Sequence, residues 1–382
     1  MMSFFKVTHL VVLALCSNFN NDILGASVSA SFVPNAKSYL RCATAVKENN
    51  HAISSSTSPC NDDIIYWPSS SSTSSQIETE THTQTRKQAE AEIITYLYKN
   101  LMTFDHINAL SLGFPVKITS GSNSTDDGEL PDGLSNGILE PTINISMHAK
   151  QNYPWTKNVP KELYYEYVIN FANVNEARTN WRPIFHKLAQ PIIQPLLQQH
   201  SSNSTVTAKQ VIQRLNDKVW KSAASYSNTE SITFQHGQTP LIYDPMSVLL
   251  FGYASCTGLS IFFVNLLRTV GIPARLAGTA AWNNVEENGN HSWIEVWDND
   301  DRKWHIMETK PASGNHENVD LYDPCQWWFC NDDKMKDTLF WAARLDGEES
   351  GGVIFPMAWD TENKAVVGEE RTTFMRELCS GC

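Results

Sequence analysis

The most regular hydrophobic pattern of the chain lies between Cys256 and Gly271. Its apolar residues recur at intervals of three and four positions, at Leu259, Phe262, Phe263, Leu266, Leu267 and Val270. This spacing predicts an amphipathic α-helix with a buried apolar face. Gly271 is suited to end the helix, and Pro273 prevents its continuation. Cys256 therefore stands at the N-terminal end of the predicted helix.

A β-hairpin is predicted downstream of this helix. Residues 291–297 and 303–308 are rich in strand-forming side chains, and the "DNDD" stretch between them is typical of a turn. The expected centre of the turn lies between Asn299 and Asp300, for either a two-residue or a four-residue loop. This register places His291 directly opposite Glu308, with Cβ atoms about 5 Å apart.

The chain before the predicted helix that begins at Cys256, called the cysteine helix below, is predicted to be mostly helical. Residues 84–102 carry apolar side chains at every fourth position, and a longer helix is expected over about 208–224. The segment 175–200 is expected to form only short helical pieces, because three prolines interrupt it: Pro183, Pro191 and Pro195. Residues 27–83, by contrast, are rich in Ser and Thr and predict a disordered linker.

The N-terminus has the pattern of an export signal. Lys6 precedes an apolar run from Leu10 to Leu15, and small residues follow at 25–27. Because this run is too short to span a bilayer, residues 1–26 are interpreted as a cleaved signal peptide, with an uncleaved anchor as the alternative. We expect a protein that is secreted or resides in the lumen of the secretory pathway, without a membrane span after signal removal.

Cysteine usage agrees with export. Of the 8 cysteines, Cys16 lies in the signal, and seven remain. Local pairs are favoured for six of them, although spacing leaves other pairings open: Cys42–Cys60, Cys325–Cys330 and Cys379–Cys382. The terminal "CSGC" is interpreted as a disulfide, because a thioredoxin-like motif would open a helix inside a βαβ unit. Cys256 is left unpaired, as expected of a reactive thiol in an exported protein.

Asparagine sequons suggest that the exported chain is a glycoprotein. They stand at Asn123, Asn144, Asn203 and Asn290. Asn123 and Asn203 lie in polar loops and are the favoured sites. The sequon at Asn290 adjoins His291 and is interpreted as unused, because a glycan there would block the site proposed below.

Charge and motifs exclude several function classes. The 382-residue chain has a formal net charge of -12 and no basic run, so nucleic-acid binding is not expected. The sequence has neither the cysteine spacing of a zinc site nor a glycine-rich phosphate loop. No metal and no cofactor is therefore expected.

The remaining chemistry points to a nucleophilic thiol. The N-terminal end of a helix favours a thiolate, so Cys256 is a candidate nucleophile with His291 as its base and Glu308 as the group that orients the histidine. An inert cysteine at a helix start is the alternative. His305 is a weaker candidate base because its side chain points to the hairpin face opposite Glu308. Other polar residues are interpreted as loop or turn residues: His236, His316, Asp298, Asp300 and Asp301.

Three segments resemble the transglutaminase-like superfamily: "ASCTGLSIFFVNLLRTVGIPAR", "NHSWIEVW" and "KWHIME". The resemblance implies a papain-like α+β fold, in which the cysteine helix packs on an antiparallel sheet. It also implies that Cys256 is the nucleophile, His291 the base and Glu308 the third member. The chain departs from the family pattern in having glutamate where aspartate is usual, and this side chain is one methylene longer. No calcium-loop motif of the animal transglutaminases is evident.

These patterns together predict five parts of the chain. They are a signal peptide (1–26), a Ser/Thr-rich linker (27–83), a mostly helical N-terminal extension (84–207), a transglutaminase-like catalytic core (208–345) and a C-terminal tail (346–382).

The expected activity is cleavage of amide bonds in proteins or peptides through a thioacyl intermediate on Cys256. Hydrolysis by an amidase or protease is favoured. Protein-glutamine acyl transfer, which cross-links proteins, and a non-catalytic binding module of the same fold are the alternatives. The Cys256 amide is a candidate oxyanion donor, whereas Trp220 and Gln235 are weaker candidates that are more readily explained as structural residues.

Overall fold

The computed structural model describes residues 76–114, 137–199, 206–313, 323–347 and 353–382, and their side chains from Arg86 onwards except that of Gln199. Several features considered above lie outside these ranges: the signal peptide, most of the linker, Cys42, Cys60, Asn123, Asn203 and His316. Within the described ranges, no helix combines the length and the apolar character needed to cross a bilayer.

A six-stranded antiparallel sheet forms the centre of the fold, with the strand order β5-β4-β3-β6-β8-β7. The strands are β3 (Ala274–Thr279), β4 (His291–Asp298), β5 (Lys303–Met307), β6 (Trp341–Arg344), β7 (Val353–Ile354) and β8 (Val367–Glu370). A separate parallel pair, β1 (Thr233–Phe234) and β2 (Tyr253–Ala254), leads directly into the cysteine helix.

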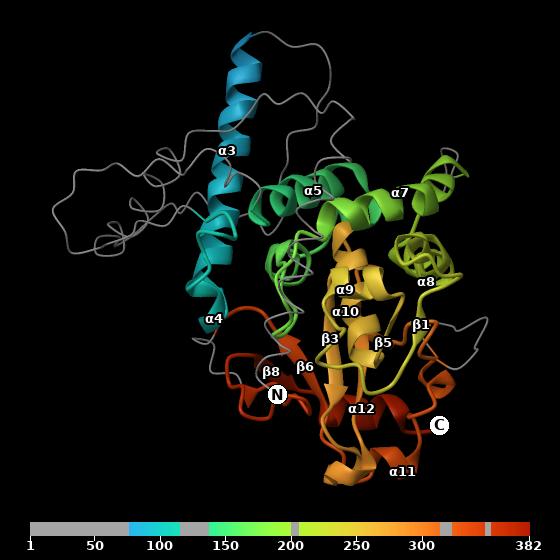
Figure 1. Ribbon diagram of the computed structural model, residues 1–382. Coiled ribbons are helices and arrows are strands. Elements are labelled where there is room, and N and C mark those ends of the chain that lie inside the picture. Colours follow the sequence, from blue (N-terminus) through green and yellow to red (C-terminus); the bar gives the residue numbers. More distant parts are fainter. Residues whose placement is uncertain (1–75, 115–136, 200–205, 314–322, 348–352) are drawn as a thin grey trace, which may run out of the picture. The chain divides into compact units, whose positions relative to one another are not determined.

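The predicted cysteine helix is present as α10 (Cys256–Thr269), and it packs against β3 and β4 (Figure 1). All of its residues are buried, because α7 and α5 contact it away from the sheet. Gly271 follows the helix with a φ of 80°, the left-handed conformation in which a glycine ends a helix without strain. The predicted α+β class is confirmed.

The helical layer precedes α10 in the chain. Its longer members are α3 (Gln76–Lys99), α5 (Leu139–Asn152), α7 (Arg182–Gln199) and α8 (Ala208–Ala223). Short helices before α10 are α4 (Thr103–His106), η2 (Pro154–Thr156), α6 (Lys161–Tyr164), η3 (Tyr165–Ile169), η4 (Ala224–Tyr226) and α9 (Pro245–Phe251). Those after α10 are η5 (Trp282–Asn284), η6 (Glu286–Asn288), η7 (Pro324–Gln326), α11 (Asp332–Met335) and α12 (Thr372–Cys379). The predicted long helix is α8, and Thr207 and Gln210 form a reciprocal capping box at its start.

Two helices are longer than expected. Helix α3 begins at Gln76, eight residues before the predicted start, so residues 76–83 belong to a helix and not to the linker. These residues include no Gly or Pro that would end a helix. Helix α7 is continuous through Pro191 and Pro195, where short pieces were expected. Because the two prolines lie four positions apart on its outer side, the opposite side still packs against α10 and α8.

The C-terminal part, residues 353–382, contributes two strands to the central sheet and a final helix. Strands β7 and β8 extend the sheet beyond β6. Two disulfides then tie α12 to the segment before α11, namely Cys325–Cys382 and Cys330–Cys379. The predicted local pairs at these four cysteines are wrong, because the packing of α12 brings each cysteine to a partner about 50 residues away. Cys256 is free and buried, as expected.

A buried ion-pair network joins the central strands to β8. The Arg275 guanidinium on β3 lies 2.7 Å from Glu295 on β4 and 2.7 Å from Glu369 on β8. Arg371 binds the other oxygen of Glu295 at 2.9 Å. Because Arg275 and Glu295 are almost fully buried, each carries a large desolvation cost that its partners offset.

We expect the Glu295→Gln substitution to lower the free energy of unfolding by about 3 kcal/mol, because two arginines lose their shared carboxylate. Chemical denaturation at neutral pH measures this loss. Glu370→Gln is the matched control, because Glu370 is an exposed carboxylate at the end of β8. A loss below about 1 kcal/mol, the size typical of a surface ion pair, would contradict the expectation.

Candidate active site

Cys256 is the first residue of α10, and this position follows from the local structure. Strand β2 ends at Ala254, and Ser255 is the extended residue that precedes the helix. The first N–H groups of a helix have no partner within it, so the thiol lies where negative charge is favoured. Gly258, in the first turn of α10, is closely surrounded and leaves no open space for a substrate. A Cβ there would come within 2.7 Å of the Ile242 carbonyl oxygen, so this glycine allows close packing of the chain.

His291 begins β4, and its Nε2 atom contacts the Oε1 atom of Glu308, which follows the last residue of β5. Both side chains are buried, with exposed fractions of 7% and 2%. The two residues therefore meet as predicted. Because Nε2 faces Glu308, Nδ1 is the ring nitrogen left for another partner.

The register of the hairpin differs from the predicted one. Asp298 pairs with Lys303, so the turn is centred between Asp300 and Asp301, one residue later than expected. Glu308 is therefore diagonal to His291 and not directly opposite. Diagonal neighbours lie on the same face of the sheet, about 7–8 Å apart, and long side chains can bridge this distance. The extra methylene of glutamate suits such an arrangement.

The Cys256 thiol interacts with the His291 ring, and this interaction shifts the pKa values of both groups. Burial alone would raise the pKa of this thiol. The hydrogen bond and positive charge of His291 outweigh it, with help from the Ser292 backbone and the Thr257 hydroxyl, and hold the pKa of Cys256 below its ordinary value.

The pKa of His291 is shifted in the opposite direction to that of Cys256. Burial alone would lower its pKa, but the contacts with Cys256 and Glu308 raise the pKa of His291 to about 9. A thiol with a lowered pKa beside an imidazole with a raised one favours the thiolate–imidazolium pair at neutral pH. The arrangement thus favours a thiolate beside a group that can donate a proton.

Aromatic side chains enclose the histidine. The ring of His291 lies 5.0 Å from that of Trp328 and 5.5 Å from that of Phe329, and Trp282 and Trp293 lie about 6 Å away. These rings displace water from the imidazole. In such surroundings, the attraction between the thiolate, the imidazolium and the carboxylate is stronger than in water.

Asn216 on α8 holds the backbone on both sides of Glu308, and sequence reasoning missed it. Its Nδ2 donates to the Glu308 carbonyl oxygen at 3.0 Å, and its Oδ1 accepts from the Lys310 N–H at 2.9 Å. A signal was present, because Asn216 stands midway between the apolar Ile212 and Trp220 at four-residue spacing. A polar residue on the apolar face of a helix indicates a specific buried partner.

We expect the Asn216→Ala substitution to lower the free energy of unfolding by about 1–3 kcal/mol, because buried backbone groups lose their partners. The rate of Cys256 alkylation near pH 6 should fall about tenfold, since Glu308 is then held less firmly. Ser222→Ala, on the exposed side of α8, is the control. An alkylation rate equal to that of the wild type would show that Asn216 does not position the acid.

The other sequence candidates do not join the site. His305 contacts Asp301 at 2.7 Å on the other face of the hairpin, as expected. Asp298 accepts a hydrogen bond from the Asp300 N–H and so acts as a turn former. With Asp301 and His305, it forms a group with metal-ligand spacing, at the far end of β4 from His291.

The two secondary candidates for oxyanion donor differ in position. The Trp220 indole N–H donates to Asn216, and its ring packs against Phe262 and Phe263, so it is a structural residue. The Gln235 backbone N–H donates to the Ala254 carbonyl, and this places Gln235 beside the residues that lead into Cys256. Its side chain is exposed.

Comparison with known proteins assigns this region to a family. No curated protein matches the chain. Residues 198–309 match the family model described as the transglutaminase-like superfamily, and this range includes Cys256, His291 and Glu308. The matched range also contains α8, α10 and the β4–β5 hairpin, the elements that carry the site. Residues 198–309 of this chain are a domain of the transglutaminase-like superfamily.

Proposed function

We propose that the chain is a thiol enzyme that cleaves amide bonds of proteins or peptides through a thioacyl intermediate on Cys256. One observation carries the proposal: Cys256, His291 and Glu308 are all buried, the His291 ring contacts Glu308, and the interaction of Cys256 with His291 lowers the pKa of the thiol and raises that of the imidazole. A non-catalytic module has no need for this combination. Perturbed titratable groups in contact with one another are typical of catalytic sites.

The proposed reaction begins with attack of the Cys256 thiolate on the amide carbonyl carbon. The carbonyl oxygen becomes negatively charged in the tetrahedral intermediate, and the proposed donors that stabilise it are N–H groups of the first turn of α10, which have no partner within the helix. The His291 imidazolium then donates its proton to the leaving nitrogen as the carbon–nitrogen bond breaks. The acyl group remains on sulfur, and Glu308 keeps the imidazole oriented.

Water is the proposed acceptor in the second half of the reaction. Neutral His291 takes a proton from water as the water oxygen attacks the thioester carbonyl carbon. The carbon–sulfur bond then breaks, the carboxylic acid leaves, and the Cys256 thiolate and the His291 imidazolium are restored. Hydrolysis needs no further binding site, whereas transfer requires one for an amine. Transfer of the acyl group to a primary amine, as in protein-glutamine cross-linking, is the alternative that starts from the same intermediate.

The proposed compartment is the secretory pathway or the outside of the cell. Two disulfides in the described part of the chain are typical of an oxidising environment. The sequence pattern of residues 1–26 supports the same proposal.

Acid quenching of the reaction, followed by mass spectrometry of the intact protein, tests the proposed function. Glutamine-containing peptides are the substrates. We expect an acyl adduct on Cys256, release of ammonia or of a new amino terminus, and no incorporation of an added primary amine. Incorporation of the amine would favour the transferase. Absence of both adduct and product across a broad peptide library would contradict an amide-cleaving enzyme.

A further inference from the structure

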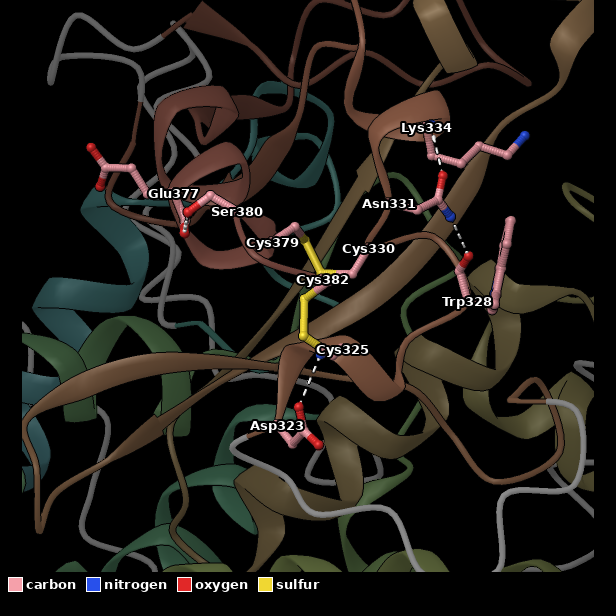
Figure 2. Close-up of a disulfide and its surroundings, with 10 residues drawn as sticks. All are labelled: Asp323, Cys325, Trp328, Cys330, Asn331, Lys334, Glu377, Cys379, Ser380 and Cys382. Atoms are coloured by element: carbon pink, nitrogen blue, oxygen red, sulfur yellow. Dashed lines mark hydrogen bonds between the residues drawn. A yellow bond between two sulfur atoms is a disulfide. The ribbon is translucent and has the colours of Figure 1, made fainter.

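The segment from Asp323 to Asn331 is fastened to the C-terminal helix at two points. Cys325 is bonded to Cys382, and Cys330 to Cys379 at the end of α12 (Figure 2). Between the two cysteines of this segment stands Trp328. Its backbone carbonyl accepts a 2.8 Å hydrogen bond from Asn331, whose Oδ1 in turn accepts from the Lys334 N–H. The backbone that presents Trp328 is therefore held covalently and by hydrogen bonds.

The Trp328 side chain contacts both Glu308 and His291. Its indole N–H donates to Oε1 of Glu308 at 3.3 Å, and this is the oxygen that contacts His291. Its ring stands edge-on to the His291 ring, with centroids 5.0 Å apart.

Trp328 is nevertheless 45% exposed. A tryptophan that only filled the core would be buried more completely. Its polar edge instead faces a carboxylate that is 2% exposed, and its apolar body covers the adjoining imidazole.

We propose that Trp328 is a positioning residue for the His291–Glu308 pair, and that its disulfide-anchored segment makes helix α12 a part of the site. The indole N–H restricts rotation of the Glu308 carboxylate, and the ring keeps water from the imidazole. Both effects favour the thiolate–imidazolium pair with Cys256. This inference rests on the proposed function.

The pH dependence of Cys256 alkylation by iodoacetamide tests the inference in the full chain. Trp328→Phe keeps a ring and removes the donor. Its alkylation midpoint should rise by about one pH unit, which is about a tenfold slower reaction near pH 6. Trp297→Phe is the matched control, because it also removes an indole N–H, but one without a hydrogen-bond partner at the other end of β4. Its midpoint should equal that of the wild type.

The disulfide anchor is tested with the paired substitutions Cys325→Ser/Cys382→Ser and Cys330→Ser/Cys379→Ser. Each pair should shift the Cys256 midpoint in the same direction as Trp328→Phe, and melting temperatures identify any variant that is unfolded. If the pH midpoint of Cys256 alkylation in the wild type lies below that of a free thiol, and Trp328→Phe has the same midpoint, this inference alone is overturned. An ordinary midpoint in the wild type would instead contradict the proposed function.

Discussion

The Cys256→Ala variant should have no measurable turnover, with a loss on the order of 10⁴- to 10⁶-fold. The reason is that every later step of the proposed reaction starts from the acyl group on this sulfur. The thiol contributes little packing, so the variant should remain folded. Steady-state assays with the peptide substrate found for the wild type measure the loss, and the melting temperature confirms the fold.

Cys256→Ser is the matched variant, since it keeps the size and the hydrogen-bonding capacity of the side chain. We expect it to be as inactive as the alanine variant, because a hydroxyl has a far higher pKa than a thiol and stays protonated beside His291. Turnover within about tenfold of the wild type in either variant would remove Cys256 from the mechanism and favour the binding-module alternative.

His291→Ala should abolish the low-pH reactivity of Cys256. The first cause of the thiol's pKa shift is burial, which raises the pKa, and His291 provides the largest opposing contributions. Without the imidazole, the pKa should rise to at least the ordinary value of about 8.5. Alkylation near pH 6 should then be on the order of 100-fold slower than in the wild type.

The raised pKa of His291 should also set an upper pH limit for amide cleavage. The imidazolium is present below about pH 9 and loses its proton as the pH rises through that value. Amide cleavage should therefore decline above about pH 9, because the leaving nitrogen no longer receives a proton. Alkylation needs only the thiolate and should persist there. His305→Ala is the control, since its ring contacts Asp301 outside the site, and it should leave both profiles unchanged. Identical profiles for His291→Ala and the wild type would contradict the assigned pair.

Helix α10 could be predicted from the sequence because its signals agree. Apolar residues recur with one period from Leu259 to Val270, and Gly271 and Pro273 mark the end. The position of Cys256 at the helix start follows directly from that pattern. The hairpin could be recognised for a similar reason, since its two strands are rich in aromatic and β-branched residues.

The register of the hairpin could not be predicted with the same certainty. Its turn contains Arg302 with a φ of 57°, a conformation that a glycine would normally signal. Because the turn contains no glycine, its acidic residues were equally compatible with a turn centred one residue earlier. His291 and Glu308 still meet, because a shift of this kind moves the partner by two residues and leaves both side chains on the same face.

The groups that hold the candidate acid depend on tertiary packing. Asn216 lies 92 residues before Glu308, and Trp328 reaches it from a segment anchored to the C-terminal helix. The periodicity of a helix or a strand gives no information about contacts between residues so far apart in the sequence. The disulfide partners illustrate the same point, because adjacent spacing favoured local pairs, whereas the docking of α12 joins Cys325 to Cys382.

The proposed mechanism requires that Cys256 is a thiolate paired with the His291 imidazolium at neutral pH. Ultraviolet absorbance of the thiolate, recorded against pH for the wild type and corrected with Cys256→Ser, tests it most directly. We expect a thiolate signal that is already present at pH 6. A signal that appears only as the pH passes about 8.5, the value of an ordinary thiol, would contradict it.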